Sequence, residues 1–172
     1  MKRDDIKLYN VIFPIWLLVI FPVAWLVVIP ANILIDSLVL CLSMKKYRIP
    51  NLWAAYRKSI IKVVLFGFFA DIIGGLFMLA SQLADRLPLS VEGQRWIYEH
   101  FTSPVMYNPF QSILSLIWVL AAMAISSLFI YFLNSKFSFR NTELDPAAQK
   151  KLSRILAILT TPILFLLPTI WF

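Results

Sequence analysis

The chain has 172 residues, of which 60% are hydrophobic and 15% are charged, and its net charge is +7. Soluble domains average about 45 to 50% apolar and about 25% charged residues, so this composition excludes an ordinary soluble domain and indicates a membrane protein. The basic residues cluster beside apolar segments, where they set membrane topology, and this argues against a nucleic-acid-binding protein.

The first apolar segment, from Leu8 to Met44, would measure about 55 Å as one helix, which is too long for a simple span of a ~30 Å hydrocarbon core. Pro30 marks its most polar point, and we predict a helix break there. Two layouts stay open. In one, residues 11–29 cross the membrane and residues 32–44 return as a short half-helix; in the other, residues 8–19 lie along the interface and a single kinked helix follows.

Three later segments are each near or above the ~20 residues that a membrane-spanning helix needs. They run from Ser59 to Leu83, from Pro109 to Leu133 and from Pro146 to Trp171. Asn108 and Asp145 each precede a proline, which is typical of a helix start. We therefore predict an all-α fold: one transmembrane domain over residues 1–172, a polytopic bundle of three long transmembrane helices plus a proline-broken N-terminal helical hairpin, with four to five membrane segments.

The distribution of Lys and Arg predicts the orientation of this bundle. The loops at residues 45–62 and 136–154 are basic and are expected in the cytoplasm, whereas the loop between them carries only Arg86 and Arg95. A cytoplasmic N-terminus then requires an odd number of crossings and favours the hairpin layout. We expect a multi-pass integral protein of the cell (plasma) membrane, in contact with the lipid bilayer and with anionic lipid head groups at the cytoplasmic face.

The outer loop, residues 86–108, contains a candidate helix start at Ser90 followed by several aromatic residues, which predicts a short interfacial helix. His100 lies beside Glu99, and we interpret these two side chains as solvated. The single Cys41 excludes a two-cysteine metal motif, and no other metal motif is present. We therefore expect no metal ion and no cofactor.

Two aspartates lie inside the apolar segments. Asp36 is nine residues before Lys45 and Asp71 is nine residues after Lys62, so each carboxyl is expected about 13 Å below the membrane surface. An ionisable side chain at that depth costs about 2.5 to 3.5 kcal/mol on insertion scales. A pair of acids at one depth is therefore the best candidate for an ion or proton site.

The residues around the two acids suggest how they could meet. Asn32 and Asp36 share one helical face, and small residues flank Asp71 on its own helix, allowing another helix to approach closely. The small residues are Gly67, Gly74 and Gly75. No Lys, Arg or His lies at that depth, so a bound cation, a shared proton, or hydrogen bonds to backbone groups freed at Pro30 are the alternatives for stabilising the acids.

Three function classes follow from these features. The first is a cation- or proton-coupled transporter or channel subunit, acting as a homo-oligomer or with a partner membrane subunit, because a broken helix and mid-membrane carboxyls recur in transporters. The second is a non-catalytic accessory, assembly or sensing subunit of a membrane complex. The third is an intramembrane aspartate-dependent hydrolase, but no catalytic motif supports it, so the sequence favours a protein that is not an enzyme.

Overall fold

A computed structural model describes residues 22–168, and every regular element in that range is helical. Three long helices dominate: α1 (Pro22–Lys46), α2 (Leu52–Leu79) and α5 (Ile113–Leu133). α2 continues as the 3-10 turns of η2 (Ala80–Arg86), and α5 continues as the π-helical segment η5 (Asn134–Ser138). The prediction of an all-α fold is confirmed for the described part of the chain.

Two continuous helical runs, of 35 and 26 residues, are long and apolar enough to cross a membrane. They are Leu52–Arg86 and Ile113–Ser138, and only 28% of the tested window of each is buried. The exposed apolar side chains of the first run recur every three or four residues, at Ile61, Leu65, Phe69, Ile72 and Leu76. A core helix of a soluble protein buries its apolar stripe, whereas an outward apolar stripe is typical of a helix surrounded by lipid.

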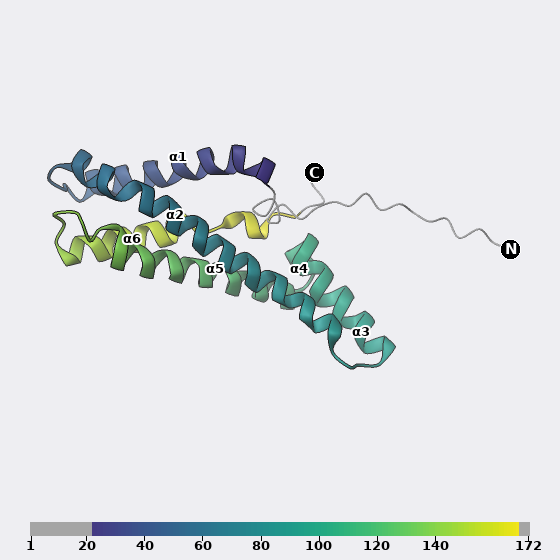
Figure 1. The fold of residues 1–172 in the computed structure, drawn as a ribbon. Helices are drawn as coiled ribbons and strands as arrows, with labels where there is room; N and C mark the ends of the chain where they lie inside the picture. Colours follow the sequence, from purple (N-terminus) through teal and green to yellow (C-terminus); the bar gives the residue numbers. More distant parts are fainter. Residues whose placement is uncertain (1–21, 169–172) are drawn as a thin grey trace.

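The long helices pack as a bundle in which α2 contacts α5, and α6 (Pro146–Leu159) contacts both α1 and α5 (Figure 1). The α1–α2 and α5–α6 connections lie at the same end of the bundle (Figure 1). The Lys62 ammonium donates to the Phe137 carbonyl at 3.4 Å, and the Lys151 ammonium lies 5.7 Å from the centroid of the Tyr47 ring. The two basic connections, expected on one side of the membrane, are therefore neighbours in space.

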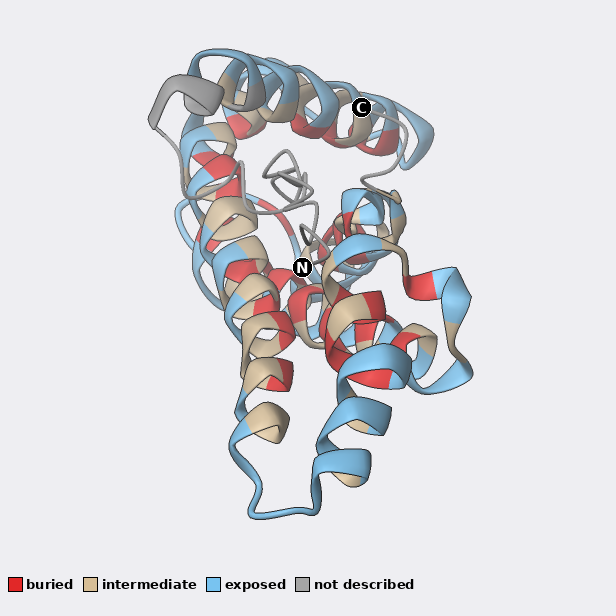
Figure 2. Cartoon of the chain, turned by 90° about the vertical axis from the view of Figure 1, so that its right-hand side faces the viewer, coloured by how far each residue is buried: buried red, intermediate tan, exposed pale blue. Residues whose placement is uncertain are grey.

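Two clusters of buried side chains hold the bundle together, and Figure 2 shows the buried positions on the helix sides that face one another. The cluster near the basic end joins α1, α2, α5, α6 and the α5–α6 connection through Leu40, Val63, Ile130, Phe139 and Leu152. The second cluster joins the far end of α2 to α5 through Met78, Phe101 and Val119.

The outer loop forms a helical run made of α3 (Val91–Ile97), the π-helical η3 (Tyr98–Thr102) and α4 (Ser103–Tyr107). Ser90 caps its start, because the Ser90 hydroxyl accepts a hydrogen bond from the Gly93 amide at 3.2 Å. The predicted helix start is thus confirmed. A short 3-10 turn, η4 (Pro109–Gln111), connects this run to α5.

The predicted helix break at Pro30 is wrong, because α1 runs without interruption from Pro22 to Lys46. Residues 22–29 belong to the same helix as residues 32–44, so the hairpin layout is wrong too. The N-terminus, expected in the cytoplasm, lies outside the described residues. Proline removes one backbone N–H from a helix, but packing on neighbouring helices stabilises such a helix. α1 has these contacts with α2 and α6. The interfacial segment suggested for residues 8–19 lies outside the described residues.

The predicted third long span, residues 146–171, is also shorter than expected. α6 ends at Leu159 after 14 residues, which is about 21 Å of helix. Thr160 and Thr161 then donate their hydroxyls to helix carbonyls, and Pro162 cannot continue the helix. A separate 3-10 turn, η6 (Ile163–Leu166), follows.

Two boundaries also differ from the prediction. α5 begins at Ile113 because the residues after Asn108 form the separate turn η4. α2 begins at Leu52, so much of the predicted basic loop is helical.

Candidate functional site

Asp36 lies on the side of α1 that faces α2, and only 6% of its surface is exposed. Its Oδ2 atom would be 3.5 Å from a Cβ atom built on Gly67, which belongs to α2. That distance is an ordinary van der Waals contact, so the carboxyl of Asp36 packs beside the α2 backbone at Gly67, where a methyl group would also fit. No hydrogen bond to Asp36 is present within residues 22–168.

Asp71 follows one turn after Gly67 on α2, and its Oδ1 atom is buried without a hydrogen-bond partner in the described part of the chain. Asp36 packs against α2 at Gly67, one helical turn before Asp71, so the two side chains lie near the same level of the α1–α2 interface. Asn32 lies one turn from Asp36 on α1 and is half-buried. The two predicted acids are therefore neighbours across the α1–α2 interface, and Asn32 belongs to the same helical face.

No basic side chain forms an ion pair with either acid among the residues that the structure describes. The one ion pair in that part of the chain joins Arg95 and Glu99, in the outer helical run. Burying a carboxylate without a counter-charge costs several kcal/mol of desolvation free energy. Such a group therefore takes up a proton or a cation. The chemistry that the two acids can perform is the binding and release of a positive charge.

The set of side chains fits a proton or a monovalent cation better than a divalent metal. Within residues 22–168 no group of three or more His, Cys, Asp or Glu side chains could hold a metal ion. Calcium takes six to eight oxygen ligands, more than two carboxyls and one amide supply, and magnesium held by so few protein ligands relies on several waters or a bound phosphate.

Hydroxyl groups near the acids form hydrogen bonds that the sequence did not reveal. The Ser126 hydroxyl, from α5, donates to the carbonyl of Ala70 at 2.7 Å, directly beside Asp71. Beside Asp36, the Ser37 hydroxyl of α1 and the Tyr56 hydroxyl of α2 form a hydrogen bond of 2.9 Å. The sequence shows these residues inside apolar segments but does not show which helix each one faces.

The three glycines near Asp71 have different surroundings. Gly74 lies at the crossing of α2 and α5, where a Cβ atom would collide with the Ser126 hydroxyl and lie 2.8 Å from Phe165 Cε2. A Cβ atom on Gly75 would meet nothing within 4 Å. Gly74 therefore permits close helix packing, whereas a methyl group would fit at Gly67 beside Asp36, and Gly75 has no packing role within the described bundle.

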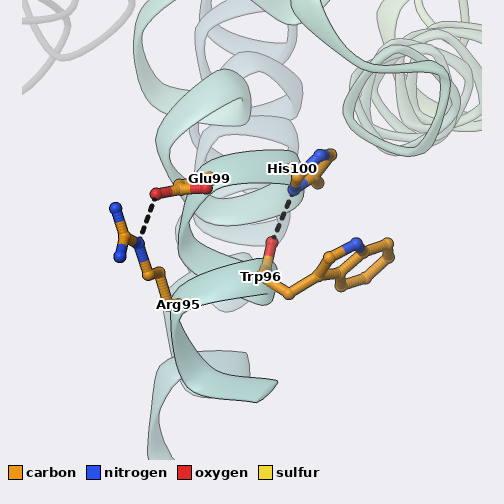
Figure 3. Close-up of polar contacts among 4 residues, drawn as sticks. All are labelled: Arg95, Trp96, Glu99 and His100. Atoms are coloured by element: carbon orange, nitrogen blue, oxygen red, sulfur yellow. Dashed lines mark hydrogen bonds and ion pairs between the residues drawn. The ribbon is translucent and has the colours of Figure 1, made fainter. Parts of the chain in front are cut away.

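The outer helical run does not provide a second site. The Arg95 guanidinium donates to Glu99 at 2.8 Å, while His100 Nδ1 donates to the Trp96 carbonyl at 3.0 Å and the His100 ring stacks on the Trp96 ring (Figure 3). The hydrogen bond from Arg95 lowers the pKa of the Glu99 carboxyl below its usual value. The His100 ring nitrogen and the Glu99 carboxylate thus have separate partners, as in a solvated surface.

Comparisons with known proteins find no matching family model, no matching curated protein and no matching solved structure.

Proposed function

We propose that this chain is a multi-pass integral protein of the cell (plasma) membrane that moves protons or monovalent cations through a site formed by Asp36 and Asp71. In this proposal α1, α2 and α5 cross the bilayer, and the end that carries the α1–α2 and α5–α6 connections lies in the cytoplasm. The shorter α6 packs inside the bundle without crossing on its own, since a crossing needs about 20 residues.

Charge asymmetry along the bundle supports this orientation. Most of the described Lys and Arg residues lie at or near the end with the two connections, whereas only Arg86 and Arg95 lie toward the opposite end. An excess of basic residues in short connections marks the cytoplasmic side of membrane proteins. The outward apolar stripe on α2 supports its contact with lipid.

The observation that carries the proposed transport is the buried Oδ1 atom of Asp71, which has no partner among residues 22–168, beside the buried carboxyl of Asp36. Membrane proteins rarely retain acids inside an apolar bundle, and those that do commonly use them as proton relays or cation sites. Two carboxyls that lie about one helical turn apart at this interface favour a shared proton or cation, because neutralising one acid removes the repulsion that two ionised acids would have.

A helical bundle of this size needs further subunits to enclose a pathway. We propose that it works as a homo-oligomer or with a partner membrane subunit, so that helices of more than one subunit enclose a path past Asp36 and Asp71. Nothing in the described helices favours the intramembrane hydrolase that the sequence left open.

The test is ion flux into liposomes that contain the purified full-length chain, with separate proton and sodium readouts. Wild type is compared with Asp36→Asn and Asp71→Asn, and Asp145→Asn is the matched control. Asp145 caps α6 by accepting a hydrogen bond from the Ala148 amide at 3.3 Å, and asparagine caps a helix equally well. We expect flux in wild type and in the control, and a loss of at least tenfold in each of the other two variants.

The Asp71 side chain is only partly buried as a whole and has no ion-pair partner within the described chain, which also favours a second candidate, an accessory subunit whose acids bind polar groups of a partner. A well-folded wild type that shows no flux for either ion contradicts the transporter. Under the second candidate, a partner is captured by wild type and by Asp145→Asn, but not by Asp71→Asn.

A further inference from the structure

An apolar groove of about 540 Å³ lies between α1 and α2 and is open along one side. α1 contributes Ile29 and Ile33, and the α2 wall includes Tyr56, Ile61, Leu65 and Ile72. Apart from the Tyr56 hydroxyl, which is hydrogen-bonded to Ser37, the lining side chains carry no polar atoms. An occupant of such a groove must present an apolar surface.

The groove runs along the helices, from Tyr56 toward Ile72 on α2. These two residues are sixteen positions apart, so the groove extends about 24 Å along the helix axis. One leaflet of a bilayer supplies about half of the ~30 Å hydrocarbon core. The groove is therefore long enough to hold one complete acyl chain that enters from the basic end.

Aromatic and basic side chains stand at that end of the groove. Arg57, Ile61 and Leu65 follow one another at intervals of four residues, so successive side chains are neighbours on α2, and Trp53 lies one turn before Arg57. The Trp53 ring stacks on the Tyr56 ring with 5.2 Å between centroids, and the Arg57 guanidinium lies 5.3 Å from the centre of the Trp53 ring. Within the described chain Arg57 has no acidic partner, so its charge is available to a ligand.

We propose that this groove is a binding site for an anionic phospholipid of the cytoplasmic leaflet. One acyl chain lies along Ile61, Leu65 and Ile72, and the phosphate group binds the Arg57 guanidinium while Trp53 lies at head-group depth. Basic pockets between transmembrane helices on the cytoplasmic side recognise anionic head groups in this way. A second copy of the chain fits less well, because a symmetric contact through this face would bring two Arg57 side chains together.

The site rests on the membrane orientation proposed above but not on ion transport, and its test does not measure flux. The purified full-length chain is reconstituted in phosphatidylcholine vesicles that contain a trace of phosphatidylglycerol, or of phosphatidylcholine, with a photoreactive acyl chain. After illumination, labelled peptides are identified by mass spectrometry. We expect phosphatidylglycerol to label the α2 peptide that contains Ile61 and Leu65 several-fold more than phosphatidylcholine does.

Three variants separate the contributions of charge and shape. Arg57→Gln should reduce labelling by phosphatidylglycerol to the level of phosphatidylcholine, whereas Arg154→Gln, an exposed arginine on α6, should leave it unchanged. Leu65→Trp fills the groove and should reduce labelling by both lipids while Arg57 is intact. Equal labelling of wild type by the two lipids, equal effects of the two arginine variants, or label confined to other helices would overturn the proposal. A cross-link at Ile61 between two copies of the chain, formed in vesicles without a photoreactive lipid, would also overturn it.

Discussion

Two adjacent glycines on α2 make the packing of the bundle testable by the same substitution. At Gly74 a Cβ atom would collide with the Ser126 hydroxyl and lie 2.8 Å from Phe165 Cε2 and 3.2 Å from the Ala122 carbonyl. At Gly75 a Cβ atom would meet nothing within 4 Å. Gly74→Ala therefore forces α2 and α5 apart, whereas Gly75→Ala leaves their contact intact.

The expected size of each effect follows from these contacts. Overpacking of a tight site costs about 1 to 3 kcal/mol. If Ser126 also loses its hydrogen bond to the Ala70 carbonyl, a membrane-embedded bond of this kind adds roughly 0.6 kcal/mol. Gly75→Ala should instead gain up to about 1 kcal/mol, because alanine is the better helix former.

Thermal unfolding of the purified chain in detergent, followed by far-ultraviolet circular dichroism, measures both effects. For a chain of this length 1 kcal/mol corresponds to about 2 to 4 °C in Tm, so Gly74→Ala should lower Tm by roughly 2 to 14 °C. Gly75→Ala should leave Tm unchanged or raise it by a few degrees. Equal Tm values for the two variants would refute the placement of Gly74 at the helix crossing.

Three further predictions follow from individual contacts. Pro30→Ala should raise the Tm of the chain without loss of flux, because α1 already continues through this position and alanine restores the missing N–H donor. A loss of flux would show that the proline itself is required. Ser126→Ala should cost about 0.6 kcal/mol, and up to about 1.7 kcal/mol, in unfolding measurements, because one interhelical hydrogen bond is lost. Arg95→Gln should raise the pKa of Glu99 toward its ordinary value in a carboxyl NMR titration, because the hydrogen bond that stabilises the carboxylate is removed. This stabilisation is present above the unfolded pKa of Glu99 and disappears as the pH falls through the lower folded value, so an unchanged titration in the variant would contradict the ion pair.

Residue chemistry in the sequence was enough to find the two acids, because a charged side chain inside an apolar helix has few stable positions other than a protein interface. The caps at Ser90 and Asp145 were found for a similar reason, since each depends on local backbone geometry alone. The helix break at Pro30 was wrong because contacts with α2 and α6 outweigh the local preference of proline.

Other features depend on how distant segments meet. The end of α6 before Pro162 had a signal in the chain, since two threonines and a proline interrupt the apolar run, but hydropathy alone extends the span across them. The hydrogen bond from Ser126 to Ala70 and the groove beside Ile61 require the packing of separate helices, which periodicity along one helix does not contain.

The central claim is that Asp36 and Asp71 act as one cation- or proton-binding site, and a double-mutant cycle of liposome flux tests it most directly. Flux of the transported ion is measured for wild type, Asp36→Asn, Asp71→Asn and the double variant, all shown to be folded. If the acids form one site, each single substitution removes most of the flux and the double variant loses little more. Independent, multiplicative losses, or flux that survives neutralisation of both acids, would contradict the claim.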